Sequence, residues 1–483
     1  MLNSNDAMHK IVAQSEDTLL KKSWSNLLTL KAELNSSSAL SKNTRQQLEQ
    51  RKEQLEQSIM QSSIDFRLAQ ENFSLHWQDI QDKLNSNEVA IEFMVNAVNH
   101  WGLMHTSTDS VMYYALVLRK NNEYPIFIPL FERDELACFM WSKQQMYDYN
   151  IYADSIYNLI WRKIEPHLLY GETIYFAPTH ALTQIALEAL PITQDSVIGD
   201  YYNMVRLSST REILHIKEQQ EMYDAVLYGG ITYDVSADEM MEESLKYNIP
   251  PHQISRSIEW DTINRGRVKY LPGTKREVEK INIYLTEQKR PTSVFTGAAA
   301  NEESFASLSG KHNSIIHIAT HGFYWNQEQA ENQDVFKTGQ KGEDDPLLRC
   351  GLLFAGANIA FSGRVDLLKD GVQDGILTAR EIVPMDLSNC QLVVLSACET
   401  GRGEYSNDGT IGLQRAFKLA GVKTIIMSLW PVNDSATQML MSEFYANWLD
   451  RKQSKREAFR NAQNAVRAHY TEPYYWAGFV MLD

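Results

Sequence analysis

Two residues that could act as a nucleophile and a base each follow a short apolar stretch. Cys398 follows the run LVVLSA, and His321 follows the run SIIHIAT. Runs of this kind, rich in branched residues and bounded by small ones, predict buried strands of a parallel sheet. Because the carboxyl ends of parallel strands share one edge of a sheet, we expect the thiol and the imidazole to meet there.

This pair predicts acyl-transfer chemistry. A cysteine attacks as the thiolate, and an adjacent imidazole is the usual group that takes its proton at neutral pH. The backbone N–H groups of Gly322 and Cys398 are placed to donate to a developing oxyanion, and glycine leaves room for a substrate backbone. Taken separately, Cys398 could be a small buried apolar residue and His321 a core histidine. Their placement at two strand ends favours the catalytic interpretation.

His317 and His321 also form an HxxxH spacing. On a helix this spacing can bind zinc, as in HExxH metallopeptidases. Here the residue after His317 is Ile318 instead of glutamate, and the surrounding pattern predicts a strand. We therefore expect no metal site and no cofactor.

The composition limits the class of protein. The chain has 483 residues, enough for several domains, and a formal net charge of -15, which argues against direct nucleic-acid binding. Its 4 cysteines include no CxxC pair, so a disulfide framework is not expected. The absence of an export signal or a long apolar run predicts neither export nor membrane insertion, and hence a cytoplasmic protein.

The order of patterns predicts an α/β protein with four segments. Residues 1–86 read as a helical lead-in or interaction segment, 87–235 as a first α/β half, 236–270 as a linker or surface excursion, and 271–483 as a second α/β half. The first half shows no nucleophile beside a base. A long polar loop at 326–345, next to His321, is the expected flexible or cleavable segment.

Five stretches together resemble the CHAT domain, a caspase-like family of bacterial cysteine peptidases related to separase. They are HIATHG at 317–322, LVVLSACETGRG at 392–403, GLQRAF at 412–417, AGVKTIIMSLWPVND at 420–434 and PYYWAGFVML at 473–482. The resemblance implies a caspase-like, mostly parallel sheet flanked by helices, with a degenerate first half and a catalytic second half. It makes His321 the general base and acid, makes Cys398 the nucleophile, and assigns the oxyanion hole to Gly322 and Cys398.

The function expected from this resemblance is limited proteolysis of a partner protein by a cysteine endopeptidase. Zymogen control and self-processing are compatible with it. Members of the family act in bacterial defence and signalling, some beside gasdermin-like pore formers, so such a protein is an expected kind of partner. Two other functions stay open, namely a catalytically silent CHAT-fold interaction module and a non-peptidase cysteine hydrolase, because a fold does not fix a reaction.

The resemblance also implies where the substrate side chain is recognised. The pocket would be lined by the strand ends near Cys398 and by the segment after residues 428–430. Asp434, with Glu399 and Asp408 as weaker candidates, could favour a basic residue before the cleaved bond. Asp434 also stands where the N-cap of the next helix is expected.

Overall fold

The computed structural model describes residues 75–99, 109–140, 149–216, 224–247, 267–325, 346–369, 371–397, 400–401, 403–406 and 409–483, together with four single helical positions before residue 52. The chain divides into two units, 1–79 and 80–483, and the description below concerns the second. Most of the predicted helical segment 1–86 lies outside the described residues, as does the loop 326–345.

One large sheet organises the second unit. Its strands are β1 (Glu88–Asn99), β2 (Asp109–Arg119), β3 (Ile126–Glu132), β4 (Thr173–Ala177), β5 (Asn203–Arg206), β6 (Ala225–Ile231), β7 (Thr292–Gly297), β8 (Ile315–Ala319), β12 (Leu392–Ser396), β15 (Thr424–Ser428) and β16 (Phe479–Leu482). They form an 11-stranded sheet in the order β3-β2-β1-β4-β5-β16-β15-β12-β8-β6-β7. Among these strands the pairs β1–β2, β2–β3 and β15–β16 are antiparallel, and the other neighbours run parallel. The predicted α/β fold with a mostly parallel sheet is confirmed.

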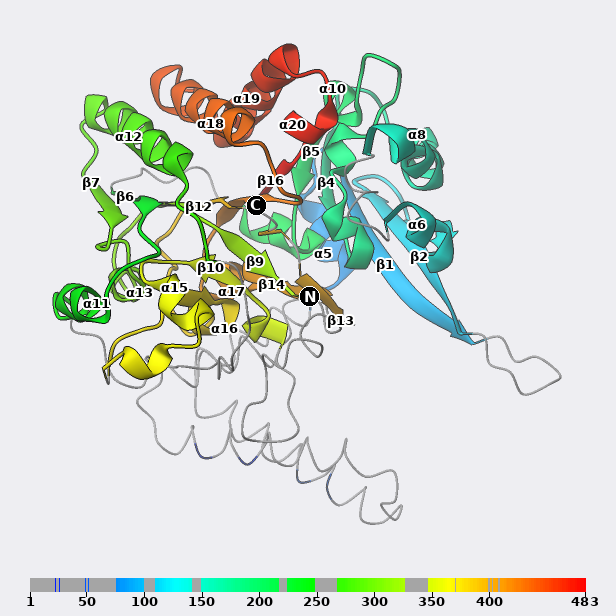
Figure 1. Cartoon of the computed structure of the whole chain (residues 1–483). Helices are drawn as coiled ribbons and strands as arrows, with labels where there is room; N and C mark the ends of the chain where they lie inside the picture. The colour runs from blue at the N-terminus through cyan, green and yellow to red at the C-terminus, as the bar shows by residue number, and fades with distance from the viewer. Residues whose placement is uncertain are drawn as a thin grey trace. The chain divides into compact units, whose positions relative to one another are not determined.

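The central strands are apolar runs because helices cover both faces of the sheet. Every residue of β6, β8, β12 and β15 is buried. Figure 1 shows α12 (Pro272–Glu287), α18 (Asp434–Tyr445) and α19 (Lys455–His469) on one side of these strands. The helices α13 (Glu302–Ala306), α15 (Ala357–Phe361) and α17 (Leu413–Leu419) lie on the other side. Burial on both faces fixes the strand ends that carry the candidate site.

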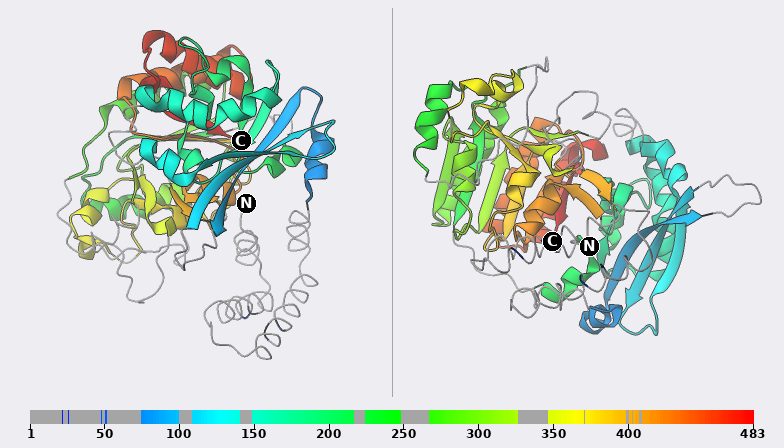
Figure 2. Two further views of the ribbon diagram at one scale, coloured as in Figure 1. Left: turned by 90° about the vertical axis from the view of Figure 1, so that its right-hand side faces the viewer. Right: turned by 90° about the horizontal axis from the view of Figure 1, so that it is seen from below.

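The sheet is continuous across the two predicted α/β halves. β6, which its place in the chain puts in the first half, lies between β8 and β7 of the second. The two groups of strands meet where β5 runs beside β16, with Leu482 paired to Arg206 and the Asp483 N–H donating to the Arg206 carbonyl at 3.0 Å. Figure 2 follows the sheet from the blue and cyan β1 and β2 at one edge to the green β6 and β7 at the other.

Two smaller sheets border the carboxyl ends of the central strands. One joins β9 (Gly322–Tyr324), β10 (Cys350–Leu353) and β11 (Ile376–Thr378), and the other is the hairpin of β13 (Gly403–Ser406) and β14 (Gly409–Gly412). A side chain at Gly351 would place its Cβ 2.4 Å from the Leu377 carbonyl oxygen and 2.8 Å from the Phe323 ring. Glycine at this position therefore lets β10 pass between its two neighbours.

In the sequence Thr274 is followed three residues later by Glu277, a spacing that predicts a capping box at the start of a helix, but the start of α12 differs. The N-cap is Leu271, which caps with no side chain, and the Thr274 hydroxyl donates to the Leu271 carbonyl at 2.7 Å. Glu277 points into the core, where its Oε1 lies 2.8 Å from His317 Nε2. The capping-box prediction was wrong because a buried histidine on β8 requires the carboxylate.

Candidate active site

His321 stands at the carboxyl edge of the large sheet, where the sequence places it. β8 ends at Ala319, and Ala319 is level with Ser396, the last residue of β12. The Thr320 N–H donates to the Ser396 carbonyl at 3.3 Å, so the ends of β8 and β12 stay hydrogen-bonded beyond the last register pair. His321 is thus the second residue after this pair on one strand, and in the sequence Cys398 is the second residue after it on the other.

The imidazole of His321 is held by a backbone carbonyl. His321 Nε2 lies 2.8 Å from the carbonyl oxygen of Lys269. A carbonyl oxygen can only accept a hydrogen bond, so Nε2 carries the hydrogen in this arrangement. In the neutral ring Nδ1 then keeps its lone pair, which makes Nδ1 the atom able to take a proton.

The segment that supplies this carbonyl, residues 267–270, is itself anchored. Asn358 Oδ1 accepts from the Val268 N–H at 2.8 Å, and Asn358 Nδ2 donates to the Val268 carbonyl at 3.1 Å. Asn358 Nδ2 also donates to Asp234 at 2.7 Å, and Asp234 pairs with Arg267 at 2.8 Å. Asn358 is buried, so one amide side chain fixes the backbone next to the histidine.

On its other side His321 packs against Tyr233, which begins a series of buried hydrogen bonds. The Tyr233 ring lies 5.3 Å from the imidazole, centroid to centroid. Burial raises the pKa of Tyr233 to about 12, so its hydroxyl stays protonated and donates to Thr320 Oγ1 at 2.9 Å. Thr320 in turn donates to the Leu353 carbonyl, while the Leu353 N–H donates to the His321 carbonyl at 2.9 Å. These contacts position the backbone of the histidine from β6 and β10.

Gly322 begins β9 with its N–H facing away from β10. In an antiparallel ladder, hydrogen-bonded and non-hydrogen-bonded pairs alternate. The bonds from Leu353 N to His321 O and from Trp325 N to Arg349 O fall on alternate positions, and Gly322 pairs with Leu352 between them. The Gly322 N–H therefore points toward the outer edge of β9, as an oxyanion donor would require.

The backbone on either side of the predicted nucleophile is fixed to β15. Cys398 and Glu399 lie outside the described residues, but Ala397, Thr400 and Gly401 are described. Ser428 Oγ donates to the Ala397 carbonyl at 2.6 Å, and the Ser428 N–H donates to Thr400 Oγ1 at 3.1 Å. The Gly401 N–H donates to the Ser428 carbonyl at 2.7 Å. One serine thus binds both ends of the short segment that contains Cys398.

The remaining predicted residues fall at different places. Asp408 lies outside the described residues. Asp434 is exposed and is the first residue of α18, whose N-cap is Asn433, with Oδ1 accepting from Ser435 N and Ala436 N. The expected N-cap role of Asp434 was therefore wrong by one residue. A Cβ at Gly273 would lie 3.9 Å from the Asp434 Cβ, so Asp434 is next to the start of α12.

His317, the other histidine of the HxxxH spacing, belongs to a buried group of hydrogen-bonded side chains. It is fully buried between Glu277, at 2.8 Å from Nε2, and the Tyr445 hydroxyl, at 3.2 Å from Nδ1. Within the described residues no group of three or more histidine, cysteine, aspartate or glutamate side chains could hold a metal ion. Of the described helices, none has both the length and the apolar character that a membrane span requires.

The other cysteines differ in environment. Burial raises the pKa of Cys390 to about 12, so this thiol stays protonated at neutral pH. Cys350 is also buried, and Cys138 is exposed on α6 (Arg133–Met140).

The sequence interpretation missed the polar residues that hold the backbone around the site, Ser428, Thr400 and Asn358. Polar side chains that bind backbone atoms form no motif of their own.

Comparisons with known proteins identify a family and two relatives that match part of this chain. The family model of the CHAT domain matches residues 150–482. Tetratricopeptide repeat protein 28 of Mus musculus is 34% identical over 110 residues, which are 22% of this chain and 4% of that protein. The Homo sapiens protein of the same name is 32% identical over 113 residues, 23% of this chain and 4% of that protein. The matched segment is thus a small part of each relative.

Solved structures overlap weakly. The Arg specific cysteine proteinase gingipain R has 9% identity and a TM-score of 0.38, covering 71% of this chain and 67% of that one. The Saccharomyces cerevisiae separase–securin complex has 8% identity and a TM-score of 0.42, covering 86% of this chain and 31% of that one. At these values neither overlap supports a conclusion about this chain.

Proposed function

Because this chain belongs to the CHAT domain family, we propose that it is a cysteine endopeptidase that cuts a partner protein at few sites. In this proposal His321 is the general base and acid, Cys398 is the nucleophile, and the N–H groups of Gly322 and Cys398 form the oxyanion hole.

One observation carries the proposal. His321 and Cys398 each follow the same register pair, Ala319 with Ser396, by two residues. Neighbouring strands lie about 4.8 Å apart, so residues leaving them at the same level start within reach of one another. The Lys269 carbonyl holds the hydrogen on Nε2 and leaves Nδ1 as the atom for the thiol proton.

The chemistry assigned to these groups balances without a cofactor. His321 Nδ1 takes the proton of the Cys398 thiol, and the thiolate forms a bond to the carbonyl carbon of the substrate peptide. The Gly322 and Cys398 N–H groups stabilise the oxyanion. The carbon–nitrogen bond then breaks as the imidazolium gives its proton to the leaving amine, and water, deprotonated by the same imidazole, hydrolyses the thioester.

The test is cleavage of a peptide library by the purified full chain, with cut sites mapped by mass spectrometry. Cys398→Ala and His321→Ala should abolish the cuts. Cys138→Ala, which removes an exposed thiol on α6, is the matched control and should leave them unchanged. Cuts that persist in Cys398→Ala, or a parent protein that cuts nothing, would contradict the proposal.

We also propose that Asp434 favours a basic residue before the cleaved bond. It is exposed and lies beside Gly273, four residues after the Lys269 carbonyl that holds His321. Asp434→Asn should lower kcat/KM for peptides with arginine at this position about tenfold, the loss of one charge-assisted hydrogen bond, with little change for alanine peptides. Equal losses for both peptides would remove Asp434 from the specificity pocket.

A further inference from the structure

A cavity lies where the two groups of strands meet. It is lined on one side by residues between Ala186 and Arg206 and on the other by α19, α20 (Pro473–Trp476) and β16. Its volume is about 90 Å³, against the roughly 10–15 Å³ that one water molecule needs. Several water molecules, or a small ligand, would fit.

The walls combine aromatic and cationic side chains. The buried rings of Phe459, Phe479 and Trp476 line the apolar part. Along α19 the arginines Arg456, Arg460 and Arg467 line the cavity, at spacings of four and seven residues that put them on one face of a helix. Three helical arginines at one cavity are notable in a chain whose net charge is -15.

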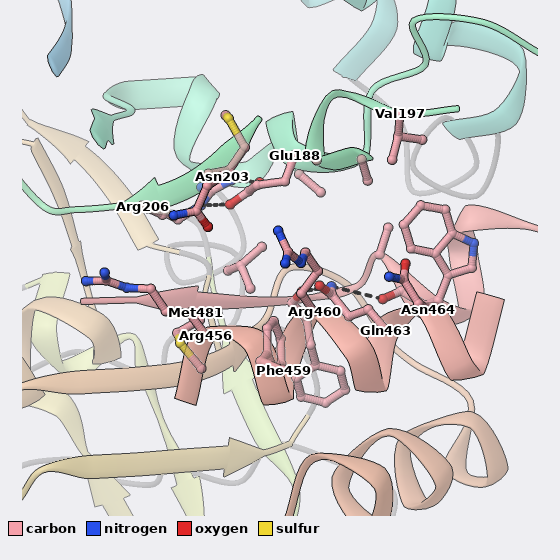
Figure 3. Close-up of a pocket in the computed structure, with 18 of the residues that line it drawn as sticks. Glu188, Val197, Asn203, Arg206, Arg456, Phe459, Arg460, Gln463, Asn464 and Met481 are labelled. Atoms are coloured by element: carbon pink, nitrogen blue, oxygen red, sulfur yellow. Dashed lines mark hydrogen bonds and ion pairs between the residues drawn. The ribbon is translucent and has the colours of Figure 1, made fainter. Parts of the chain in front are cut away.

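Most of the cationic groups in the lining already have an acidic partner. Arg206 pairs with Glu188 at 2.8 Å, an interaction that Figure 3 draws as dashed lines. Arg456 pairs with Asp483 at 2.7 Å, and Arg467 pairs with Asp200 at 2.9 Å. Counting only the arginine, aspartate and glutamate side chains of the lining, four positive charges face three negative ones.

The fourth arginine, Arg460, supplies the excess charge. Within the described part of the chain its guanidinium has no salt bridge, although Glu457, one turn earlier on α19, interacts with it electrostatically. Arg460 is exposed. Figure 3 shows it projecting from α19 into the gap, toward the segment that carries Glu188 and Asn203. A guanidinium at the mouth of a partly aromatic cavity fits an oxyanion, which it can bind through two parallel hydrogen bonds.

We propose that this cavity is an effector site for a small organic oxyanion with an apolar body. The aromatic walls would take the body, and Arg460, with the side-chain amide of Asn203 in the lining, would take the phosphate or carboxylate group. The ligand would contact both groups of strands and so stabilise their junction, where β5 and β16 share one register pair and Arg467 is ion-paired with Asp200.

A short path of contacts leads from the cavity to the strand end of Cys398. Phe479 lines the cavity and pairs with Ser428 on β15. The Leu429 N–H donates to the Gly478 carbonyl at 2.8 Å, which extends this contact past the strand end. Ser428 in turn binds the Ala397 carbonyl at 2.6 Å. Ligand binding would therefore change the reactivity of Cys398. This coupling to Cys398 rests on the proposed function, whereas the binding of a ligand in the cavity does not.

The test uses phenyl phosphate as the probe, measured by isothermal titration calorimetry with the full chain carrying Cys398→Ala. Phenol supplies the body without the charge, and inorganic phosphate supplies the charge without the body. Phenyl phosphate should bind more tightly than either. Arg460→Gln should weaken it about tenfold or more, the contribution of a hydrogen bond to a charged group.

Arg276→Gln is the matched control, because Arg276 is exposed on α12 and does not line the cavity. It should bind phenyl phosphate like the parent. No binding by the parent, equal binding of phenol, or unchanged binding by Arg460→Gln would overturn the site, whatever the peptidase activity of the chain.

The effector role has its own readout. In a Cys138→Ser chain that keeps Cys398, saturating phenyl phosphate should change the rate of alkylation at Cys398 by iodoacetamide at least about twofold. Arg460→Gln should remove that change. An unchanged rate in the presence of bound probe would overturn the coupling, and the peptide-library assay would judge the peptidase proposal separately.

Discussion

Replacing His317 by leucine should destabilise the fold strongly although His317 has no role in the proposed reaction. His317 and Tyr445 are fully buried, and Glu277 is 4% exposed. Burial, followed by the charge of Glu277, raises the pKa of Tyr445, so its hydroxyl stays protonated. Every polar atom is satisfied if this hydroxyl donates to His317 Nδ1 and His317 Nε2–H donates to Glu277. The leucine variant removes both interactions at once.

The expected loss follows from the two groups left behind. Each buried polar group that loses its partner costs about 1–3 kcal/mol, and more if it is charged. Two such groups, the Glu277 carboxyl and the Tyr445 hydroxyl, give a loss of about 2–6 kcal/mol in the free energy of unfolding. Leucine fills a volume similar to that of histidine, so a cavity adds little.

Urea unfolding followed by circular dichroism measures this loss. The control is His312→Leu, an exposed position near the same strand, which should stay within about 0.5 kcal/mol of the parent. The double variant His317→Leu with Glu277→Leu should recover part of the loss, because it removes a buried polar group with its partner. A loss below about 1 kcal/mol for His317→Leu, or a double variant as unstable as the sum of the singles, would refute the reasoning.

Three further predictions concern contacts around the site and the strand junction. Ser428→Ala removes the hydrogen bond to the Ala397 carbonyl and should lower the free energy of unfolding by about 1 kcal/mol in urea titrations; an unchanged midpoint would contradict it. Asn358→Ala releases the segment 267–270 and should lower kcat/KM about tenfold, the effect of about 1.4 kcal/mol in a positioned base; unchanged kinetics would exclude a positioning role. Burial alone would raise the pKa of Asp483, but its arginine and lysine neighbours outweigh burial and lower it. Its ion pair therefore stabilises the fold above about pH 4 and is lost as the pH falls through the lowered pKa, so Asp483→Asn should show a flatter loss of stability between pH 6 and pH 2 than the parent; parallel curves would contradict this assignment.

The strands that precede His321 and Cys398 were predictable because burial on both faces demands continuous apolar sequence. β8 and β12 coincide with the runs before His321 and Cys398. The hairpin of β2 and β3 was also predictable, since polar residues 120–123 separate two alternating stretches. In these cases the local pattern and the tertiary environment favour the same structure.

Other features depend on residues distant in the chain, which no local pattern encodes. The position of β6 between β7 and β8 is a property of the strand order. Glu277 fitted a capping box, but its carboxylate serves His317, 40 residues away. Asn433 and Asp434 are both good N-cap residues, and only the backbone shows that Asn433 is the cap. The supporting polar contacts of Ser428 and Asn358 were unpredictable for the same reason.

The central claim, that His321 activates Cys398, is tested most directly by the pH dependence of thiol alkylation. In a Cys138→Ser chain, peptide mapping should locate the fastest reaction with iodoacetamide at Cys398, whereas Cys390, whose pKa burial raises to about 12, stays unmodified at pH 7. His321→Ala should slow the reaction of Cys398 at pH 7 about tenfold and shift its midpoint toward the ordinary thiol pKa of about 8.5. An identical rate and midpoint in parent and His321→Ala would contradict the assignment of the pair.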